Sequence, residues 1–286
     1  MRPHVQGFFD ADTNTISYIV HDPASRAAAI IDPVANFRAR DAHLSYEAAD
    51  SLLQAIADQS LDLRYILETH AHADHLSAAH YLREATGAPV AIGTHIADVQ
   101  KIFAPLFAAQ DVTTDGAAFD ILLAEGDSLT LGSLTIRALH TPGHTPACLT
   151  YVIGDAAFVG DTLFMPDYGT ARADFPGGDA ATLFRSIRRI LDLPGDTRIF
   201  VGHDYPPAGR STAAWETSVA DQRRSNIHVH DGVDEAQFVA MREARDATLA
   251  APLLILPSLQ VNIRAGRLPP AAADEPVFLR LPVNRI

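Results

Sequence analysis

Four residues with metal-binding side chains lie together in the run HAHADH over residues 70–75. Neutral imidazole and carboxylate groups are natural ligands of zinc, iron and manganese. In an extended or turning segment His70 and His72 point to the same side, while Asp74 and His75 turn away at the start of the next helix. One short loop can therefore serve two adjacent metal positions. The competing interpretation is an exposed polar loop that happens to be rich in histidine, and the spacing argues against it.

Three further ligand-type side chains each lie at the end of a predicted strand, namely His144, Asp161 and His203. The three strands are expected over 134–139, 156–159 and 199–201. Taken singly, a histidine or aspartate at a strand end is more often a turn or capping residue. With the run at 70–75, however, ligand-type residues follow four separate strands, and loops at strand ends carry function on a rigid scaffold. We therefore predict that these side chains converge on a metal centre.

The elements that must position these residues are strands and helices mixed along the whole chain. Short apolar runs punctuated by glycine or proline predict strands at 14–21, 27–31, 63–68 and 89–92, and a β-rich region over 119–164. Helical spacing of apolar residues predicts helices at 46–59, 75–85, 94–103, 179–191, 213–224 and 235–249. This mixture indicates an α/β class of fold.

Composition limits the kinds of protein that this chain can be. Its 286 residues are 48% hydrophobic, enough for a substantial core, yet they contain no apolar run long enough for a membrane span. The first residues lack the apolar segment of a secretory signal, and the single cysteine, Cys148, fits a reducing compartment and a buried, inert thiol. A net charge of −13 argues against nucleic-acid binding. We expect a soluble cytoplasmic protein without nucleic-acid or membrane partners.

The order of the motifs resembles a known family. His-x-His-x-Asp-His, Pro-Gly-His, Gly-Asp-Thr-Leu-Phe and Gly-His-Asp-Tyr match the metallo-β-lactamase superfamily in type, order and approximate spacing, over at least residues 14–205. The resemblance implies an αββα sandwich of two mixed sheets flanked by helices, with the metal site at one edge. It suggests a catalytic core over 1–205 and a helical, Pro-rich extension over 206–286, packed on the core as one structural domain.

Within that superfamily, segments 66–79, 169–178 and 203–205 resemble the persulfide dioxygenases, the sulfur dioxygenase family that includes the ethylmalonic encephalopathy protein. The segment from Trp215 to Asn262 resembles a bacterial subgroup of β-lactamase-like hydrolases. The dioxygenase resemblance implies one Fe(II) held by His70, His144 and Asp161. Two histidines and one carboxylate leave coordination positions open for both O2 and substrate.

The same resemblance implies a reaction and roles for the other residues. A low-molecular-weight thiol persulfide such as glutathione persulfide would be oxidised with O2 to sulfite and free thiol, a reaction of sulfur metabolism and sulfide detoxification. Residues around the iron would orient ligands and tune the metal, and Tyr205 would donate a hydrogen bond to substrate or oxygen. The surrounding residues are His72, Asp74, His75 and His203. A homodimer is also implied.

A second interpretation is a dinuclear metallohydrolase of the glyoxalase II type, acting on a thioester. All seven motif residues would then bind two zinc or iron ions, with a bridging hydroxide as nucleophile. His70, His72 and His144 would hold one ion, Asp74, His75 and His203 the other, and Asp161 would bridge them. A catalytically silent metal-binding or sensor protein on the same fold is a third interpretation, and the open coordination positions argue against it.

Arg172 and Tyr205 each have two interpretations. The planar donor fork of Arg172 suits a substrate carboxylate, which predicts a substrate-binding role. Alternatively, Arg172 and Asp174 form an ion pair that supports their loop. Tyr205 is next to the expected site in sequence, but it could equally be a core tyrosine with a satisfied hydroxyl.

Overall fold

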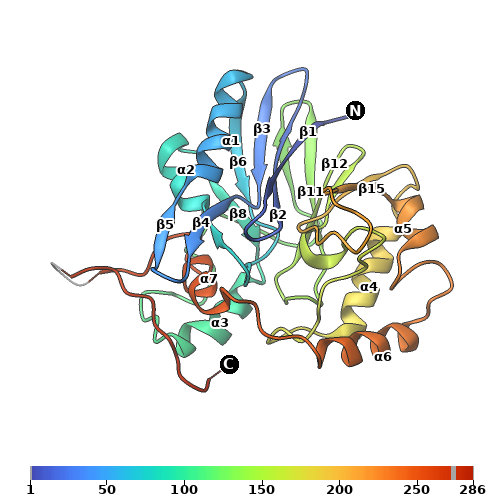
Figure 1. Ribbon diagram of the computed structural model, residues 1–286. Coiled ribbons are helices and arrows are strands. Elements are labelled where there is room, and N and C mark those ends of the chain that lie inside the picture. The colour runs from blue at the N-terminus through green and yellow to red at the C-terminus, as the bar shows by residue number, and fades with distance from the viewer. Residues whose placement is uncertain (1, 272–274, 286) are drawn as a thin grey trace.

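The computed structural model describes residues 2–271 and 275–285. Its first sheet has the strand order β1-β2-β3-β6-β8-β9 (Figure 1). Pairing is antiparallel from β1 to β3 and parallel from β3 to β9, so the sheet is mixed. The bounds are β1 His4–Asp10, β2 Thr15–His21, β3 Ala27–Ile31, β6 Asp62–Leu67, β8 Val90–Gly93 and β9 Ile121–Leu123.

The second sheet has the order β10-β11-β12-β13-β14-β15. Its neighbours are antiparallel except for the parallel pair β13 and β14, so this sheet is mixed as well. The bounds are β10 Ser128–Leu131, β11 Leu134–His140, β12 Leu149–Ile153, β13 Ala156–Phe158, β14 Arg198–Phe200 and β15 Glu216–Ser218. A short third sheet joins β5 (His43–Ser45), β4 (Val34–Arg38) and β7 (Leu76–Ser77).

The alternation of side chains along β2 shows why the two large sheets stack. Ile16, Tyr18 and Val20 belong to a buried cluster shared with the second sheet, whereas Ile19 belongs to the cluster under the helices of the first sheet. The Tyr18 ring packs edge-on against Phe158, with ring centroids 5.3 Å apart. Successive side chains of a strand point to opposite faces, so β2, which is buried on both faces, is covered by the second sheet on one side and by helices on the other.

Helices cover the outer face of each sheet, as Figure 1 shows. The helices α1, α2, α3 and α7 share the buried cluster of the first sheet, and α4 and α6 share that of the second. The bounds are α1 Glu47–Asp58, α2 Ala79–Thr86, α3 Ile96–Leu106, α4 Ala180–Leu191, α5 Val219–Ser225, α6 Glu235–Asp246 and α7 Ile255–Asn262, with a 3₁₀ turn η1 at Gly160–Thr162. The α/β class and the predicted layers are confirmed.

The structure departs from the sequence-based elements in several places, and strands β1, β4 and β5 were not predicted. The helix expected from residue 75 begins at Ala79, because Leu76 and Ser77 pair with β4 instead. The helix expected over 213–224 begins at Val219, because residues 216–218 form β15 at the edge of the second sheet. Helix α7 lies in the Pro-rich tail, where no helix was predicted. The division at residue 205 stays a prediction. No helix among the described residues is long and apolar enough to span a membrane.

Candidate metal centre

The predicted ligands converge at the edge of the sandwich where four strands end. The run at 70–75 follows β6, and the other three side chains follow β11, β13 and β14. The structure brings the seven predicted side chains into two compact groups, in which one ligand atom from each residue lies within 4.8 Å of the others, and a third such group joins His72 to Asp32 and Glu68. One group is His70, His144 and Asp161, and the other is His72, Asp74, His75 and His203. The prediction from the sequence, that ligand-type side chains at the ends of four strands lie together, therefore agrees with the structure.

Two glycines let the loops of this centre approach closely. Gly160, just before Asp161, has φ +49°, and a Cβ there would lie 2.4 Å from the Thr69 hydroxyl. A Cβ at Gly202 would lie 2.7 Å from Asp161 Oδ1. Only glycine avoids these clashes and tolerates the positive φ at residue 160. Both glycines thus set the position of the Asp161 carboxylate.

The hydrogen bonds of the first group fix its imidazoles as ligands. His70 Nε2 and His144 Nε2 lie 3.9 and 3.8 Å from Asp161 Oδ2. His144 Nδ1 must donate to the carbonyl of Arg172 at 2.8 Å. The Thr69 hydroxyl donates to Asp32, so at 3.0 Å it accepts from His70 Nδ1. Both rings therefore carry their proton on Nδ1 and present the free lone pair of Nε2, the arrangement in which an outer bond orients a metal-binding histidine.

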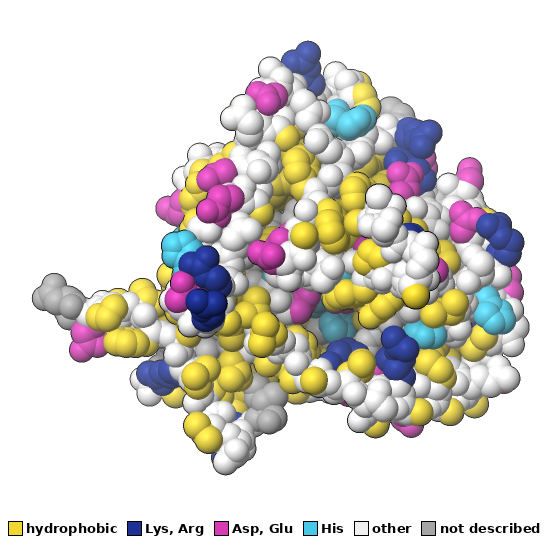
Figure 2. Space-filling view, viewed as in Figure 1, with side chains coloured by type: hydrophobic (Ala, Val, Ile, Leu, Met, Phe, Trp, Pro, Cys, Tyr) yellow, Lys and Arg dark blue, Asp and Glu magenta, His cyan; other side chains and the backbone are white. Residues whose placement is uncertain are grey.

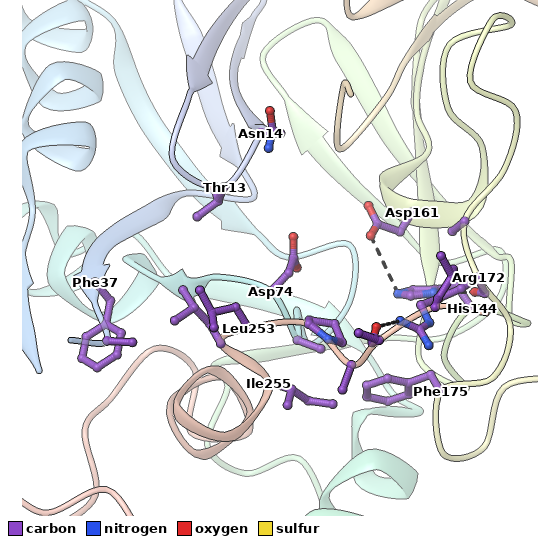
Figure 3. A pocket seen from close by; sticks show the side chains of 18 of the residues that line it. Thr13, Asn14, Phe37, Asp74, His144, Asp161, Arg172, Phe175, Leu253 and Ile255 are labelled. Atoms are coloured by element: carbon purple, nitrogen blue, oxygen red, sulfur yellow. Dashed lines mark hydrogen bonds and ion pairs between the residues drawn. The ribbon is translucent and has the colours of Figure 1, made fainter. Parts of the chain in front are cut away.

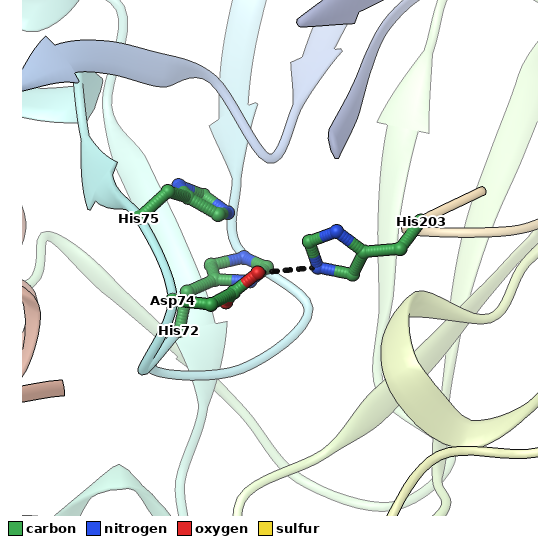
Figure 4. Close-up of side chains that lie close together, drawn as sticks. All are labelled: His72, Asp74, His75 and His203. Carbon is green, nitrogen blue, oxygen red and sulfur yellow. Dashed lines mark ion pairs between the residues drawn. The ribbon is translucent and has the colours of Figure 1, made fainter. Parts of the chain in front are cut away.

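Figure 4 shows the second group, in which Asp74 and His203 lie side by side. His203 Nε2 is 3.2 Å from Asp74 Oδ2 and 3.3 Å from Asp161 Oδ1, so His203 touches both groups. His75 Nδ1 donates to the carbonyl of Leu76 at 3.2 Å, which leaves Nε2 as the free lone pair. Burial is the main cause that lowers the pKa of His75 to about 3, and the charge of neighbouring His72 is the second. His75 is thus a neutral imidazole.

His72 has carboxylates on one side and the second group on the other. Its Nε2 lies 3.1 Å from Asp32 Oδ1 and 3.4 Å from Glu68 Oε2, and all three side chains are buried. Burial opposes charge on the ring, but the Asp32 and Glu68 carboxylates outweigh it and raise the pKa of His72 well above its usual value. The structure does not gather His72 into one group with His70 and His144, as the dinuclear interpretation arranged them.

The donor set fits a transition metal, because its buried polar atoms lack other partners. Among the described residues, most of the buried side-chain atoms without a hydrogen bond belong to this centre. They include His70 Nε2, His72 Nδ1, Asp74 Oδ2, His75 Nε2, Asp161 Oδ1 and His203 Nε2. A buried polar atom without a partner costs about 1–3 kcal/mol. A bound cation would satisfy several of these atoms at once, and imidazole with carboxylate is a donor set for iron or zinc.

A cavity of about 1490 Å³ opens onto the centre. Asp74, His144 and Asp161 line it, together with Leu253 and Ile255 of the C-terminal segment (Figure 3). In the space-filling view a hollow on this face holds histidine and acidic side chains with hydrophobic ones around it (Figure 2). Residues 249–255 line the cavity, so the C-terminal segment forms part of its wall.

Tyr205 lines the same cavity and stacks on His203, with ring centroids 5.7 Å apart. Burial, then the Asp74 and Asp161 carboxylates, raises the pKa of the Tyr205 phenol above its usual value. Its hydroxyl therefore stays protonated and can act as a donor. A contact with substrate stays a prediction.

Arg172 also lines the cavity, but its donors already have partners. Its Nε and one terminal nitrogen bind Asp174 at 2.5 and 2.7 Å, and the other terminal nitrogen donates to the Ala250 carbonyl at 2.7 Å. The structure thus contains the supporting ion pair. Recognition of a substrate carboxylate by Arg172 stays a prediction.

Sequence reasoning missed the residues behind the ligands. Asp32 follows β3, so the strand-end signal that marked Asp161 applied to it as well. Asp32 accepts from the backbone N–H of Thr69 at 2.7 Å and from its hydroxyl at 2.8 Å. Asn262 also bonds to this loop from α7, and no sequence signal indicated it.

Comparison with known proteins identifies the family. The model of the metallo-β-lactamase superfamily matches residues 13–203, and the chain belongs to that superfamily. It is 31% identical to the mitochondrial persulfide dioxygenase ETHE1 of Mus musculus, over 90% of this chain and 87% of that one. The crystal structure of ETHE1 from Myxococcus xanthus covers 92% of this chain and all of its own, with a TM-score of 0.74 and 31% identity. These matches support the persulfide dioxygenase family within the superfamily.

More similar relatives carry other names. The chain is 51% identical to a probable metallo-hydrolase of Burkholderia pseudomallei, over 99% of both chains. It is 45% identical to glyoxylase B2 of Dictyostelium discoideum, over 99% of this chain and 98% of that one. It spans 65% of the length of further relatives named β-lactamase hydrolase-like proteins. The chain is thus an enzyme of the superfamily, with a metal-binding site of histidine and aspartate residues.

Proposed function

We propose that the protein is a persulfide dioxygenase that uses one Fe(II) per chain. The observation that carries this proposal is the compact group of His70, His144 and Asp161, which does not include His72 and of which His144 and Asp161 line the cavity. Two imidazoles and one carboxylate on one face are the ligand set of non-haem iron oxygenases. The likeness to persulfide dioxygenase ETHE1 supports the same activity.

The reaction balances as one persulfide, one O2 and one water giving one free thiol, sulfite and two protons. Bound Fe(II) supplies open positions at which substrate sulfur and O2 meet. The protein's own residues prepare that place. Thr69 and the Arg172 carbonyl hold the two imidazoles, and His203 lies 3.3 Å from Asp161 Oδ1, where its N–H can orient the carboxylate. The protonated Tyr205 hydroxyl is a donor for substrate or oxygen at the cavity wall.

The substrate class is a low-molecular-weight thiol persulfide, and glutathione persulfide is the first to test. The protein is prepared anaerobically and its iron content per chain is measured. O2 uptake with glutathione persulfide is then measured in a separate step. Persulfide-dependent O2 uptake, sulfite formation and about one iron per chain support the proposal. Two metals per chain with thioester hydrolysis and no O2 uptake contradict it.

A contrast between two aspartates sharpens the test. Asp161→Ala removes a ligand of the proposed iron and should abolish both iron retention and O2 uptake. Asp74→Ala should leave about one iron bound, because Asp74 belongs to the other group. Asp167→Ala, which removes an exposed carboxylate paired with Arg210, is the control and should retain iron and activity. Equal iron loss from the Asp74 and Asp161 variants contradicts a single-iron centre.

A dinuclear thioester hydrolase is the second candidate. Its specific support is the second group of four donors, together with the relatives named metallo-hydrolase and glyoxylase. In that case Asp74→Ala should halve the metal content and stop hydrolysis of a glutathione thioester. The same metal analysis therefore separates the two candidates.

A further inference from the structure

Asn262, the last residue of α7, lies against the backbone of the loop that carries four predicted ligands. Its carboxamide nitrogen donates to the carbonyls of His72 and His75, both at 2.8 Å. Its carboxamide oxygen accepts from the backbone N–H of Ser77, also at 2.8 Å. All three bonds are buried. Asn262 lies 59 residues beyond the segment, 13–203, that the family model matches.

A loop of this kind needs such a partner. Residues 70–75 belong to no helix or strand, so their backbone groups have no ladder to join. Buried carbonyls need donors, and one planar carboxamide offers two donors and an acceptor in fixed geometry. Since the backbone sets the direction of each side chain, fixing the carbonyls of His72 and His75 also fixes where their imidazoles point.

The third bond extends this hold to the His72 side chain. The Ser77 hydroxyl donates to Glu68 Oε1, and Glu68 Oε2 lies 3.4 Å from His72 Nε2. Asn262 positions Ser77, Ser77 holds Glu68, and Glu68 faces the outer nitrogen of His72. Asn262 is thus bonded to the 70–77 loop, and through Ser77 it is linked to the Glu68 carboxylate, which lies beside His72.

Helix α7 is a firm base for this contact. Gln100 donates from α3 to the Ile263 carbonyl at 2.9 Å, just after Asn262. Arg264 holds Asp111 with two hydrogen bonds, at 2.7 and 2.8 Å. A Cβ at Gly266 would lie 2.9 Å from the Ser77 carbonyl, so the backbones of the tail and the loop are in close contact. Figure 1 shows α7 beside α3.

We propose that Asn262 is a positioning residue of the metal centre, which holds the His72–Ser77 backbone and thereby fixes the 70–77 loop around the metal. The role is independent of the proposed function, since a one-metal centre takes His70 from this loop and a two-metal centre takes His72, Asp74 and His75 as well. It makes the C-terminal segment part of the metal centre as well as of the cavity wall.

The test compares two matched substitutions on the same helix. Asn262→Asp keeps the size and the acceptor but removes both donors to the loop carbonyls. Gln260→Glu makes the same chemical change two residues away: Gln260 is also buried, and it donates to the carbonyls of Leu256 and Arg280 and accepts from the Arg280 N–H. Its partners lie in the tail, so it controls for loss of a buried carboxamide.

The measurement is the rate at which the purified metal-loaded protein releases its metal to a chelator. Asn262→Asp should release metal about 10- to 100-fold faster than the unsubstituted protein, the range expected when an outer partner of a ligand is lost. Gln260→Glu should stay within about threefold, because the Gln260 side chain bonds to Leu256 and Arg280 and makes no bond to the 70–77 loop. The visible spectrum of bound Co²⁺ should change in the Asn262 variant alone. Equal release rates in the two variants, or an unchanged rate in Asn262→Asp, overturn the proposal.

A measurement on the unsubstituted protein covers the case in which Asn262→Asp does not fold. Because the Ser77 N–H is bonded to Asn262 rather than to a ligand, it should stay protected from hydrogen exchange after the metal is removed. Exchange of the Ser77 amide at the rate of an exposed loop in the metal-free protein overturns the proposal. Neither the metal-release rate nor the exchange of the Ser77 amide depends on catalytic turnover. The role of Asn262 and the dioxygenase activity can therefore fail independently of each other.

Discussion

His228 links the stability of the protein to pH near the metal centre. Its Nδ1 accepts a hydrogen bond from the Thr170 N–H at 3.1 Å, so the ring must be neutral. Burial, then the charges of Arg242 and Arg245, lowers the pKa of His228 to about 4. Two residues further on, the Arg172 carbonyl holds the His144 ring. Protonation of His228 therefore weakens the loop that orients a predicted ligand.

The sign and size of the effect follow from the two pKa values. Above about pH 6.5 the ring is neutral in both the folded and unfolded protein, so the contribution of His228 to stability does not change with pH there. As pH falls from about 6.5 to about 4, only the unfolded state takes up the proton, and stability is lost. A shift of roughly 2.5 units corresponds to about 3 kcal/mol, or about 2–3 kcal/mol after allowing for the residual exposure of the ring.

The assay is urea unfolding of metal-free protein from about pH 7 to about pH 4, for the unsubstituted chain and for His228→Asn. Asparagine can place an acceptor near the position of Nδ1 but does not titrate. The variant should therefore lose less stability over this interval, by about 2–3 kcal/mol. Subtracting the two curves removes the contributions of the other buried histidines, which both proteins share. Parallel curves for the two proteins would refute the reasoning.

Three further perturbations have definite expected outcomes. Asp32→Ala leaves His72 without its nearest carboxylate and should lower the free energy of unfolding by about 3–5 kcal/mol. Asp41→Ala, at an exposed ion pair, should lower it by less than about 1 kcal/mol. Equal losses in the two variants would contradict this. Asp246 accepts from the Ala173 N–H, which adjoins the Arg172 carbonyl that holds His144. Asp246→Ala should therefore speed metal release to a chelator about tenfold. An unchanged release rate would count against this link. Burial raises the pKa of the Cys148 thiol to about 12, so a maleimide should label it only after unfolding, and complete labelling of the folded protein would disprove the burial.

The convergence of these side chains was predictable because their chemistry is visible in single residues. A histidine or aspartate after one apolar run is weak evidence by itself, but four such runs with ligand-type ends in one chain indicate a shared site. The αββα layers were predictable for a similar reason, since strands such as β3 are apolar on both faces and must be covered on both. The family resemblance added the arrangement of the two sheets.

The grouping of these side chains was implied by the family resemblance and does not follow from local sequence, because it depends on the loop backbone. His70 and His72 both follow β6, yet only His70 joins His144 and Asp161. The expected helix start at residue 75 was wrong, because the pairing of Leu76 and Ser77 with β4 is a tertiary interaction that local spacing does not show. The position of His72 between Asp32, Glu68 and the second group likewise depends on the residues that directly follow β3 and β6.

Helix α7 was hidden for a different reason. Its residues from Ser258 to Asn262 are all buried, so the helix lacks the one-sided apolar pattern by which surface helices are detected. Yet its first residue, Ile255, lines the cavity, and its last, Asn262, is bonded to the metal loop. Eight helical residues span about 12 Å, so one rigid element joins the cavity wall to the ligand backbone. A change in this tail that displaces Asn262 therefore acts on the metal centre through α7, even where it touches no ligand.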